Sequence, residues 1–323
     1  MSLIKPATPE NLLQAARNLK NGALVGLPTE TVYGLASDAE NKFAVKRIYE
    51  VKERPEDHPL IVHIGAIEYL KKWTKNIPDY ALTLAERFWP GPMTLVLKRS
   101  QLAHNFITGN QDSIAIRYPR NKIALSVLNN FHTLGGNGLV APSANKFGAV
   151  SPTSARAVNE EIGNQLNIES DSILDGGDCE IGLESTIIDC LGKVPSILRY
   201  GAITENHITK ILKIKNFENY KDLEIRHSGK MDKHYSPKAQ IIINGKPEQG
   251  DGFLALSEIA TPSGCYRIAA PENAIEFAKI LYSAFRKGDA MKLKRIFIVK
   301  PKGSGIEKAI NERIEKAAFK IFY

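Results

Sequence analysis

The sequence predicts an α/β protein built from two domains. A chain of 323 residues suits two domains of ordinary size. Short β-prone runs alternate with amphipathic stretches, which is the pattern of helices packed on a sheet. The alternation stops in the polar stretch KNFENYKDLEIRHSGKMDKHYSPKA and then resumes. We therefore place the first domain at residues 1–205, a linker at 206–238 and a smaller second domain at 239–323.

The first domain opens with a helix expected over residues 8–21. Thr8 can cap this helix, Pro9 suits its first turn, and Gly22 ends it. The further strands are expected at 23–29, 60–64, 93–99, 113–119, 138–144, 185–190 and 196–201. The further helices are expected at 44–52, 79–88, 121–130, 153–166 and 204–213.

The second domain repeats this pattern on a smaller scale. Its β-prone runs are QIIING, GFLALS, CYRIAA and RIFIVK, and its helices are expected at 272–287 and from residue 306. We expect a small Rossmann-like α/β domain, joined to the first domain by an extended linker.

Composition indicates a soluble globular protein. Hydrophobic residues make up 43% of the chain and charged residues 24%. No apolar run approaches the ~20 residues of a membrane span, and the opening MSLIKPATPE lacks a signal-peptide core. Cys179, Cys190 and Cys265 are too scattered for a disulfide framework, so we expect reduced thiols and a cytoplasmic location without membrane contact. The net charge of +8 favours polyanions such as nucleotides or nucleic acid, or it serves solubility alone.

The densest chemical signal is PTETVYGL, followed by KERPEDHPLIVHI. Thr29 and Thr31 come after a strand, where their hydroxyls can bind a small polar ligand or simply close a turn. Lys52 and Arg54 stand at a helix exit, where they suit a phosphate clamp or merely complement the helix dipole. His63 lies in an apolar strand, where a core histidine is commoner than a ligand.

Two arginines stand in or at the end of predicted strands, Arg117 in SIAIRYP and Arg199 in LRYG. A buried charge without a partner is very unfavourable. Each guanidinium therefore needs a partner, which is either a ligand carboxylate or phosphate, or a protein Asp or Glu.

Hydroxyl and amide groups gather in two further motifs. APSAN places Ser143 and Asn145 in a tight turn that can direct donors at an anion. Ser151 precedes a proline and is either another such donor or a helix cap. LEST places Ser185 and Thr186 at the start of a strand.

Several well-known site motifs are missing. The sequence has no G-x-x-x-x-G-K-[ST] P-loop, no H-E-x-x-H, no paired C-x-x-C and no G-x-S-x-G. GNGLVA fits a dinucleotide fingerprint formally, but a proline follows it where a helix should begin.

Taken together, these motifs resemble the threonylcarbamoyl-AMP synthase family, the YrdC-type domain in its long, two-domain form. PTETVYGL, the K-x-RP…PLIVHI block, APSAN followed by S-P, and LEST…LRYG carry the match over most of residues 10–202. KHYSP and GSGIEKAINERIEKAA resemble the long form's linker and closing helix. The resemblance implies a twisted, open, mixed sheet with a positively charged concavity and a linker that crosses the active site.

The family resemblance implies that L-threonine, bicarbonate and ATP give threonylcarbamoyl-AMP and pyrophosphate. A tRNA threonylcarbamoyl transferase complex then uses this product beside the anticodon. Lys52 and Arg54 would be catalytic, and Mg²⁺ would be held by phosphates without direct protein ligands. The residues expected to bind threonine are Thr29, Thr31, His63, Arg117, Ala141 and Ser185. The residues expected to bind ATP are Lys52, Arg54, His58, Ala115, Ser143, Asn145, Ser151, Arg199 and Tyr235.

The sequence departs from the family pattern in two places. His58 stands where the family often has Asn or Lys, and an imidazole would make phosphate binding depend on pH near neutrality. The linker reads HSGKMDKHY where S-P-G-M usually precedes H-Y, and Lys230 stands where the family has glycine.

Three other functions remain open at this stage. An RNA- or tRNA-binding module without turnover would use the positive charge, although the strands lack interleaved aromatic and basic residues. A hydrogenase-maturation carbamoyltransferase would carry zinc-finger and acylphosphatase-like segments, which this sequence lacks. A purely structural protein would leave the polar residues at the strand ends unexplained.

Overall fold

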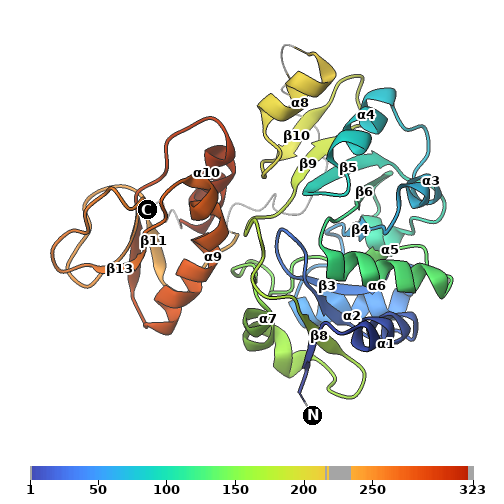
Figure 1. Ribbon diagram of the computed structural model, residues 1–323, viewed down its shortest axis with the longest axis horizontal. Helices are drawn as coiled ribbons and strands as arrows, with labels where there is room; N and C mark the ends of the chain where they lie inside the picture. The colour runs from blue at the N-terminus through green and yellow to red at the C-terminus, as the bar shows by residue number, and fades with distance from the viewer. Residues whose placement is uncertain (1, 215–216, 218–233, 319–323) are drawn as a thin grey trace.

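The computed structural model describes residues 2–214, 217 and 234–318, and two sheets dominate it (Figure 1). The large sheet has ten strands in the order β1-β8-β2-β3-β7-β4-β6-β5-β9-β10. Its strands are β1 (Ile4–Pro6), β2 (Val25–Leu27), β3 (Gly34–Asp38), β4 (Ile61–His63), β5 (Met93–Lys98), β6 (Ser113–Arg117), β7 (Leu139–Val140), β8 (Ser172–Asp175), β9 (Thr186–Asp189) and β10 (Ser196–Arg199).

The large sheet is mixed, which confirms the expected fold class. Parallel pairs such as β4 with β6 and β5 with β9 alternate with antiparallel pairs such as β5 with β6. His63 lies opposite Arg117 in the β4–β6 pair. The sheet therefore places two of the expected site residues side by side on neighbouring strands.

The helices of the first domain cover this sheet. They are α1 (Pro9–Lys20), α2 (Lys42–Lys52), α3 (Leu70–Trp73), α4 (Asp79–Phe88), α5 (Asn105–Thr108), α6 (Lys122–Thr133) and α7 (Ala155–Ile162). A further helix, α8 (Glu205–Leu212), falls almost wholly in the expected linker and packs against α4 of the first domain. Thr8 caps α1 as expected, because its side chain accepts a hydrogen bond from the backbone N–H of Asn11. Figure 1 shows α1, α2 and α6 gathered at one end of the sheet.

The second sheet is small and wholly parallel, with the order β11-β14-β12-β13. Its strands are β11 (Gln240–Ile242), β12 (Gly252–Leu254), β13 (Tyr266–Ala269) and β14 (Arg295–Ile298), and its helices are α9 (Ala274–Ala290) and α10 (Ile306–Ala317). Both helices lie between this sheet and the first domain (Figure 1). The side chains that reach the first domain therefore come from α9 and α10.

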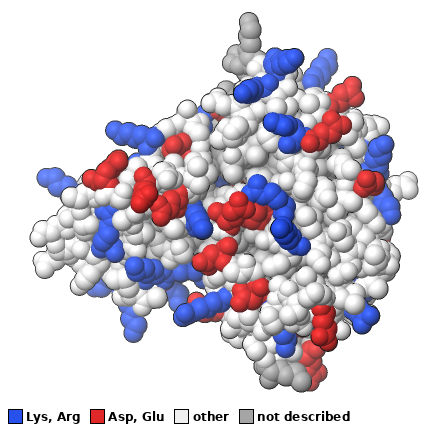
Figure 2. Space-filling model, in the orientation of Figure 1, with Lys and Arg blue, Asp and Glu red and all other residues white. Residues whose placement is uncertain are grey.

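Most of the expected linker, residues 215–233 except 217, lies outside the described residues. His234 and Tyr235, at its end, are described and buried. No helix of the described part is long and apolar enough to cross a membrane. On the face shown in Figure 2, basic and acidic side chains are intermingled, and blue does not form a separate field.

Candidate active site

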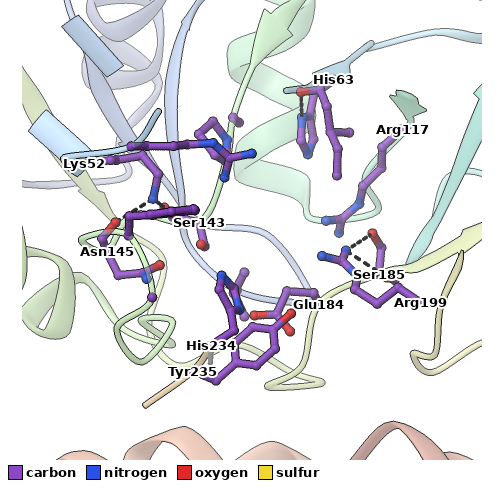
Figure 3. Close-up of a pocket in the computed structure, with 17 residues that line it drawn as sticks. Lys52, His63, Arg117, Ser143, Asn145, Glu184, Ser185, Arg199, His234 and Tyr235 are labelled. Atoms are coloured by element: carbon purple, nitrogen blue, oxygen red, sulfur yellow. Dashed lines mark hydrogen bonds between the residues drawn. The ribbon is translucent and has the colours of Figure 1, made fainter. Parts of the chain in front are cut away.

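A pocket lies where several strands and loops of the first domain meet the end of the linker (Figure 3). Its walls come from the C-terminal end of α2, from β4 and β6, from the loop after β7, and from the start of β9 and the end of β10. The lining residues are Val32, Lys52, Arg54, Ile61, His63, Arg117, Ala141, Pro142, Ser143, Asn145, Phe147, Gly148, Glu184, Ser185, Arg199, His234 and Tyr235.

Lys52 is the last residue of α2, and its side chain turns inward. Its Nζ donates hydrogen bonds to the backbone carbonyls of Ser143, at 2.6 Å, and Asn145, at 2.5 Å. Burial, with help from the nearby Arg54, holds the pKa of Lys52 well below its usual value. The APSAN turn thus uses two N–H donors of the Lys52 amino group and fixes its position in the pocket wall.

Arg54 follows after a helix stop at Glu53, which has a left-handed backbone with φ 52°. Its Nη2 donates to the Pro59 carbonyl at 2.9 Å, and its guanidinium lies 5.6 Å from the Phe147 ring centre. Burial lowers the pKa of Arg54 to about 10, which leaves it charged at neutral pH. A planar, charged donor held in this way can bind a phosphate.

The loop after β7 is held firmly by the residues expected to bind ATP. The Asn145 side-chain amide donates to the backbone carbonyls of Lys146, at 2.7 Å, and Ala149, at 2.9 Å. Ser143 pairs with Gly34 in an isolated β-bridge. These bonds fix the loop on which Lys52 docks.

His63 and Arg117 form the opposite wall of the pocket (Figure 3). Burial lowers the pKa of His63 to about 3, so its ring is neutral. Nδ1 lies 3.3 Å from the Ile61 carbonyl, which favours a proton on Nδ1 and leaves Nε2 as an acceptor. Arg117 Nη2 donates to Glu30 Oε1 at 2.7 Å, and both side chains are buried. From the sequence, the partner of Arg117 was either a ligand or a protein carboxylate. In the structure the partner is the carboxylate of Glu30.

Ser185 and Arg199 complete that wall. Arg199 donates from Nε and Nη2 to the Ser185 carbonyl, at 3.1 and 2.9 Å, and from Nη2 to Ser185 Oγ at 3.1 Å. Ser185 Oγ also lies 2.7 Å from Thr94 Oγ1. The Ser185 hydroxyl is therefore fixed by its neighbours and faces the pocket.

His234 and Tyr235 fill much of the pocket from the linker side (Figure 3). Their rings are in edge contact, with centres 3.9 Å apart. The cavity that remains is about 50 Å³, which is room for a few water molecules. A nucleotide does not fit in this space with His234 and Tyr235 in these positions.

Ten of the fifteen expected site residues line this pocket: Lys52, Arg54, His63, Arg117, Ala141, Ser143, Asn145, Ser185, Arg199 and Tyr235. The others lie outside the lining. Thr29 and Thr31 are buried next to each other, with their hydroxyl oxygens 2.8 Å apart. His58 contacts the Phe147 ring, and Ala115 lies on β6 opposite Ile61.

Ser151 also lies just behind the lining, and its Oγ donates to Glu184 Oε1 at 2.6 Å. The cap of α7 is Ser154, whose side chain accepts from the backbone N–H of Ala157. The alternative of Ser151 as a helix cap is therefore wrong.

The sequence interpretation missed Glu30, Glu184 and Phe147. Glu30 and Glu184 stand inside PTET and LEST, beside residues that were singled out. Both are almost fully buried, at 2% and 6% exposure. A glutamate within an otherwise small or apolar buried motif was the available signal, because such a carboxylate needs a cation.

No group of three His, Cys, Asp or Glu side chains suited to a metal ion occurs in the described ranges. The pocket instead offers cations and hydroxyls. It can therefore bind a multiply charged anion next to a small polar molecule.

Two family matches divide the chain. Residues 17–201 match a family described as telomere recombination, which groups Sua5, YciO and YrdC proteins. Residues 203–319 match the family described as threonylcarbamoyl-AMP synthase, C-terminal domain.

Individual relatives agree with these matches. A threonylcarbamoyl-AMP synthase of Bacillus subtilis is 35% identical and covers 95% of this chain and 92% of its own length. One from Pyrococcus abyssi is 42% identical over 71% of this chain and 66% of its own length. The crystal structure of P. abyssi Sua5 complexed with L-threonine superposes with a TM-score of 0.83 at 32% identity, covering 98% of each chain.

Proposed function

The chain belongs to the threonylcarbamoyl-AMP synthase family, and on that premise we propose that it converts L-threonine, bicarbonate and ATP into threonylcarbamoyl-AMP and pyrophosphate. The product would serve tRNA modification through a separate transferase complex. Three free cysteines and the absence of a membrane-spanning helix in the described part are compatible with the cytoplasm as the place of reaction.

One observation carries the proposal: a single pocket holds Lys52, Arg54, Arg117 and Arg199. Four basic side chains face one lining carboxylate, Glu184, and this surplus of basic groups suits a ligand with several negative charges. Arg117, His63 and Ser185 lie on one wall and suit the carboxylate and hydroxyl of threonine. Lys52 lies across from them (Figure 3), Arg54 lines the same pocket, and both suit the triphosphate.

The first step joins the threonine amine to bicarbonate. The threonine ammonium gives up one proton, and its nitrogen attacks the bicarbonate carbon to form a C–N bond. One C–O bond of bicarbonate breaks, its oxygen leaves as water with a second nitrogen proton, and N-carboxythreonine results. This carbamate is short-lived in bulk water, so enclosure of the site protects it. Closure by His234 and Tyr235 would provide that enclosure.

The second step transfers the adenylyl group. A carbamate oxygen attacks the α-phosphorus of ATP, the bond to the bridging oxygen breaks, and pyrophosphate leaves with its electron pair. Two anions must meet, so Lys52, Arg54 and Arg199 would offset their repulsion. Mg²⁺ is expected on the phosphate oxygens, which supply the hard ligands that this ion prefers.

The closed pocket requires a moving part. His234 and Tyr235 must leave before ATP can enter, because the cavity is only about 50 Å³ with both side chains in place. We propose that the linker acts as a gate, open for substrate entry and closed during the chemistry.

Pyrophosphate release tests the proposed reaction. The full chain is assayed with ATP and Mg²⁺, with and without bicarbonate and L-threonine, and with L-serine as a control. We expect release that needs both threonine and bicarbonate. Release indifferent to threonine would reject the substrate assignment. Tight, salt-sensitive tRNA binding without any release would favour the RNA-binding alternative.

A further inference from the structure

The second domain contacts the pocket wall through the side chain of Glu184. It lines the pocket at the start of β9, yet its carboxylate bonds mainly to the second domain. Arg313 Nε on α10 donates to Glu184 Oε2 at 3.1 Å. The Tyr282 hydroxyl on α9 lies 2.9 Å from Oε2 and 3.1 Å from Oε1.

The surrounding contacts hold these helices against the first domain. Gly182, with φ +79°, packs so closely on α9 that an added Cβ would come within 2.5 Å of the Lys279 carbonyl oxygen. The Tyr200 backbone N–H donates to Glu312 Oε2 at 3.2 Å, and Lys308 pairs with Glu205. Arg313 also donates from Nη1 to Glu312 Oε2 at 2.9 Å, so its side chain lies between two carboxylates and has 0% exposure.

Two arginines act on the one Glu184 carboxylate. Burial tends to raise its pKa, but Arg313, Arg199 and the Ser151 hydroxyl outweigh this and hold the pKa at about 2. The carboxylate is thus ionised at neutral pH and bonded to Arg313, while Arg199 bonds to Ser185. Without Arg313, the stranded Glu184 charge would compete with Ser185 for the Arg199 guanidinium.

We propose that Arg313 is a positioning residue of the first domain's site: it neutralises Glu184 and so keeps Arg199 bonded to Ser185. This inference rests on the proposed function, because it assumes that Ser185 contributes to threonine binding. The second domain would then complete the substrate pocket through one buried ion pair.

The experiment measures L-threonine binding to the full chain by calorimetry, which needs no turnover. Arg313→Met is compared with the double variant Arg313→Met/Glu184→Gln, which leaves no unpaired charge at position 184 and keeps similar side-chain shapes. Glu312, the other partner of Arg313, loses Arg313 equally in both variants and keeps Lys316. We expect about tenfold weaker threonine binding in the single variant, a typical size for coupling between contacting residues. The double variant should recover to within about threefold of the wild type.

Arg267→Met is the matched control. Arg267 donates to the carbonyls of Ala255, Leu256 and Ile259 within the second domain and has no contact with Glu184. It should lower the thermal stability but leave the threonine Kd unchanged. A merely structural role for Arg313 would lower the fraction of binding-competent protein and leave its Kd as in the wild type.

Three results would overturn the proposal: an unchanged Kd in folded Arg313→Met, a double variant as weak as the single one, or an equal loss in Arg267→Met. If Arg313→Met does not fold, Arg313→Gln replaces it, because its amide can still donate a hydrogen bond to Glu184 but carries no charge that neutralises the carboxylate. A Kd about threefold weaker then supports the proposal, and an unchanged Kd overturns it. A wild type that does not bind threonine would instead reject the proposed function itself.

Discussion

Two buried arginine–glutamate pairs lie beside the pocket. In one the arginine faces the pocket, and in the other the glutamate does. In Arg117–Glu30 the arginine lines the pocket and the glutamate lies behind it. In Arg313–Glu184 the glutamate lines the pocket and the arginine lies behind it. The first pair is formed within one domain, whereas the second joins the two domains.

The difference shows how similar pairs can serve different purposes. A cation at the pocket surface can contact an anionic substrate, so its loss should reduce binding or chemistry directly. Arg313, behind the Glu184 carboxylate, reaches the pocket through that carboxylate and through the Tyr235 ring, whose centre lies 5.4 Å from its guanidinium carbon. Variants of the pocket-facing cations should therefore reduce substrate binding or turnover directly, whereas variants of Arg313 should affect the substrate only indirectly.

The largest effect is expected for a pocket-facing cation at the proposed phosphate site. Arg54→Ala should lower kcat about a hundredfold, because removal of one preorganised charge typically raises a barrier by roughly 3 kcal/mol. Steady-state pyrophosphate release measures this. Arg120→Ala is the control, because its guanidinium pairs with the exposed Glu180 away from the lining. Near-normal turnover in Arg54→Ala would remove Arg54 from the chemistry.

The next effect tests the carboxylate behind Arg117. Glu30→Gln strands the Arg117 charge and should destabilise the fold by about 3 kcal/mol. Bound threonine would return a carboxylate to Arg117, so threonine should raise the Tm more in this variant than in the wild type. Thermal unfolding with and without threonine measures the difference. An equal shift in both proteins would argue against contact between Arg117 and the substrate carboxylate.

A third prediction concerns pH, because both His63 and His234 are buried with their pKa lowered to about 3. Their unfolded forms take up a proton below about pH 6.5, while the folded forms do not until about pH 3. Stability should therefore fall as the pH drops from 6.5 towards 3. At pH 5 each histidine should contribute a loss of about 2 kcal/mol.

His63→Gln should remove one of these two contributions, so its urea midpoint should fall less than that of the wild type between pH 7.5 and pH 5. His104→Gln, on an exposed side chain, is the control and should follow the wild type. Equal pH dependence in His63→Gln and the wild type would show that the ring is not buried in its neutral form.

The smallest effect is expected at the gate. The Tyr235 hydroxyl is buried and bonds to no group in the described part of the chain. Tyr235→Phe should therefore leave the stability within about 0.5 kcal/mol, while the KM for ATP rises if this hydroxyl contacts the nucleotide in the open state. An unchanged KM would mean that the Tyr235 hydroxyl does not contact ATP and that Tyr235 acts through the contacts of its ring, such as that with His234.

The sequence predicted the helices and strands that have a clear hydrophobic period. It also predicted the site motifs that stand at the ends of these elements. The 79–88 helix agrees with α4, and the strands expected at 60–64 and 113–119 contain β4 and β6. β3 (Gly34–Asp38) and β8 (Ser172–Asp175) were missed, because GLASD and SILD are short and rich in small or polar residues. Their strand conformation comes from neighbours in the sheet, which a local pattern does not contain.

The site shows the same limit. Ten expected residues line one pocket because their motifs lie at strand and helix ends, which the sequence does indicate. The pairing of Glu184 with Arg313 joins residues 129 positions apart in different domains. Neither residue has a local signal for the other, so only the packing of α10 against the first domain reveals their relation.

The most direct test of the proposed reaction follows the carbon of bicarbonate. The full chain is incubated with ATP, Mg²⁺, L-threonine and ¹³C-bicarbonate, and the adenylate product is analysed at once by mass spectrometry. We expect a threonine adenylate that carries the labelled carbon between the amine and the phosphate. An adenylate of threonine without the label would mean that the amino acid carboxylate itself attacks ATP, and it would contradict the account.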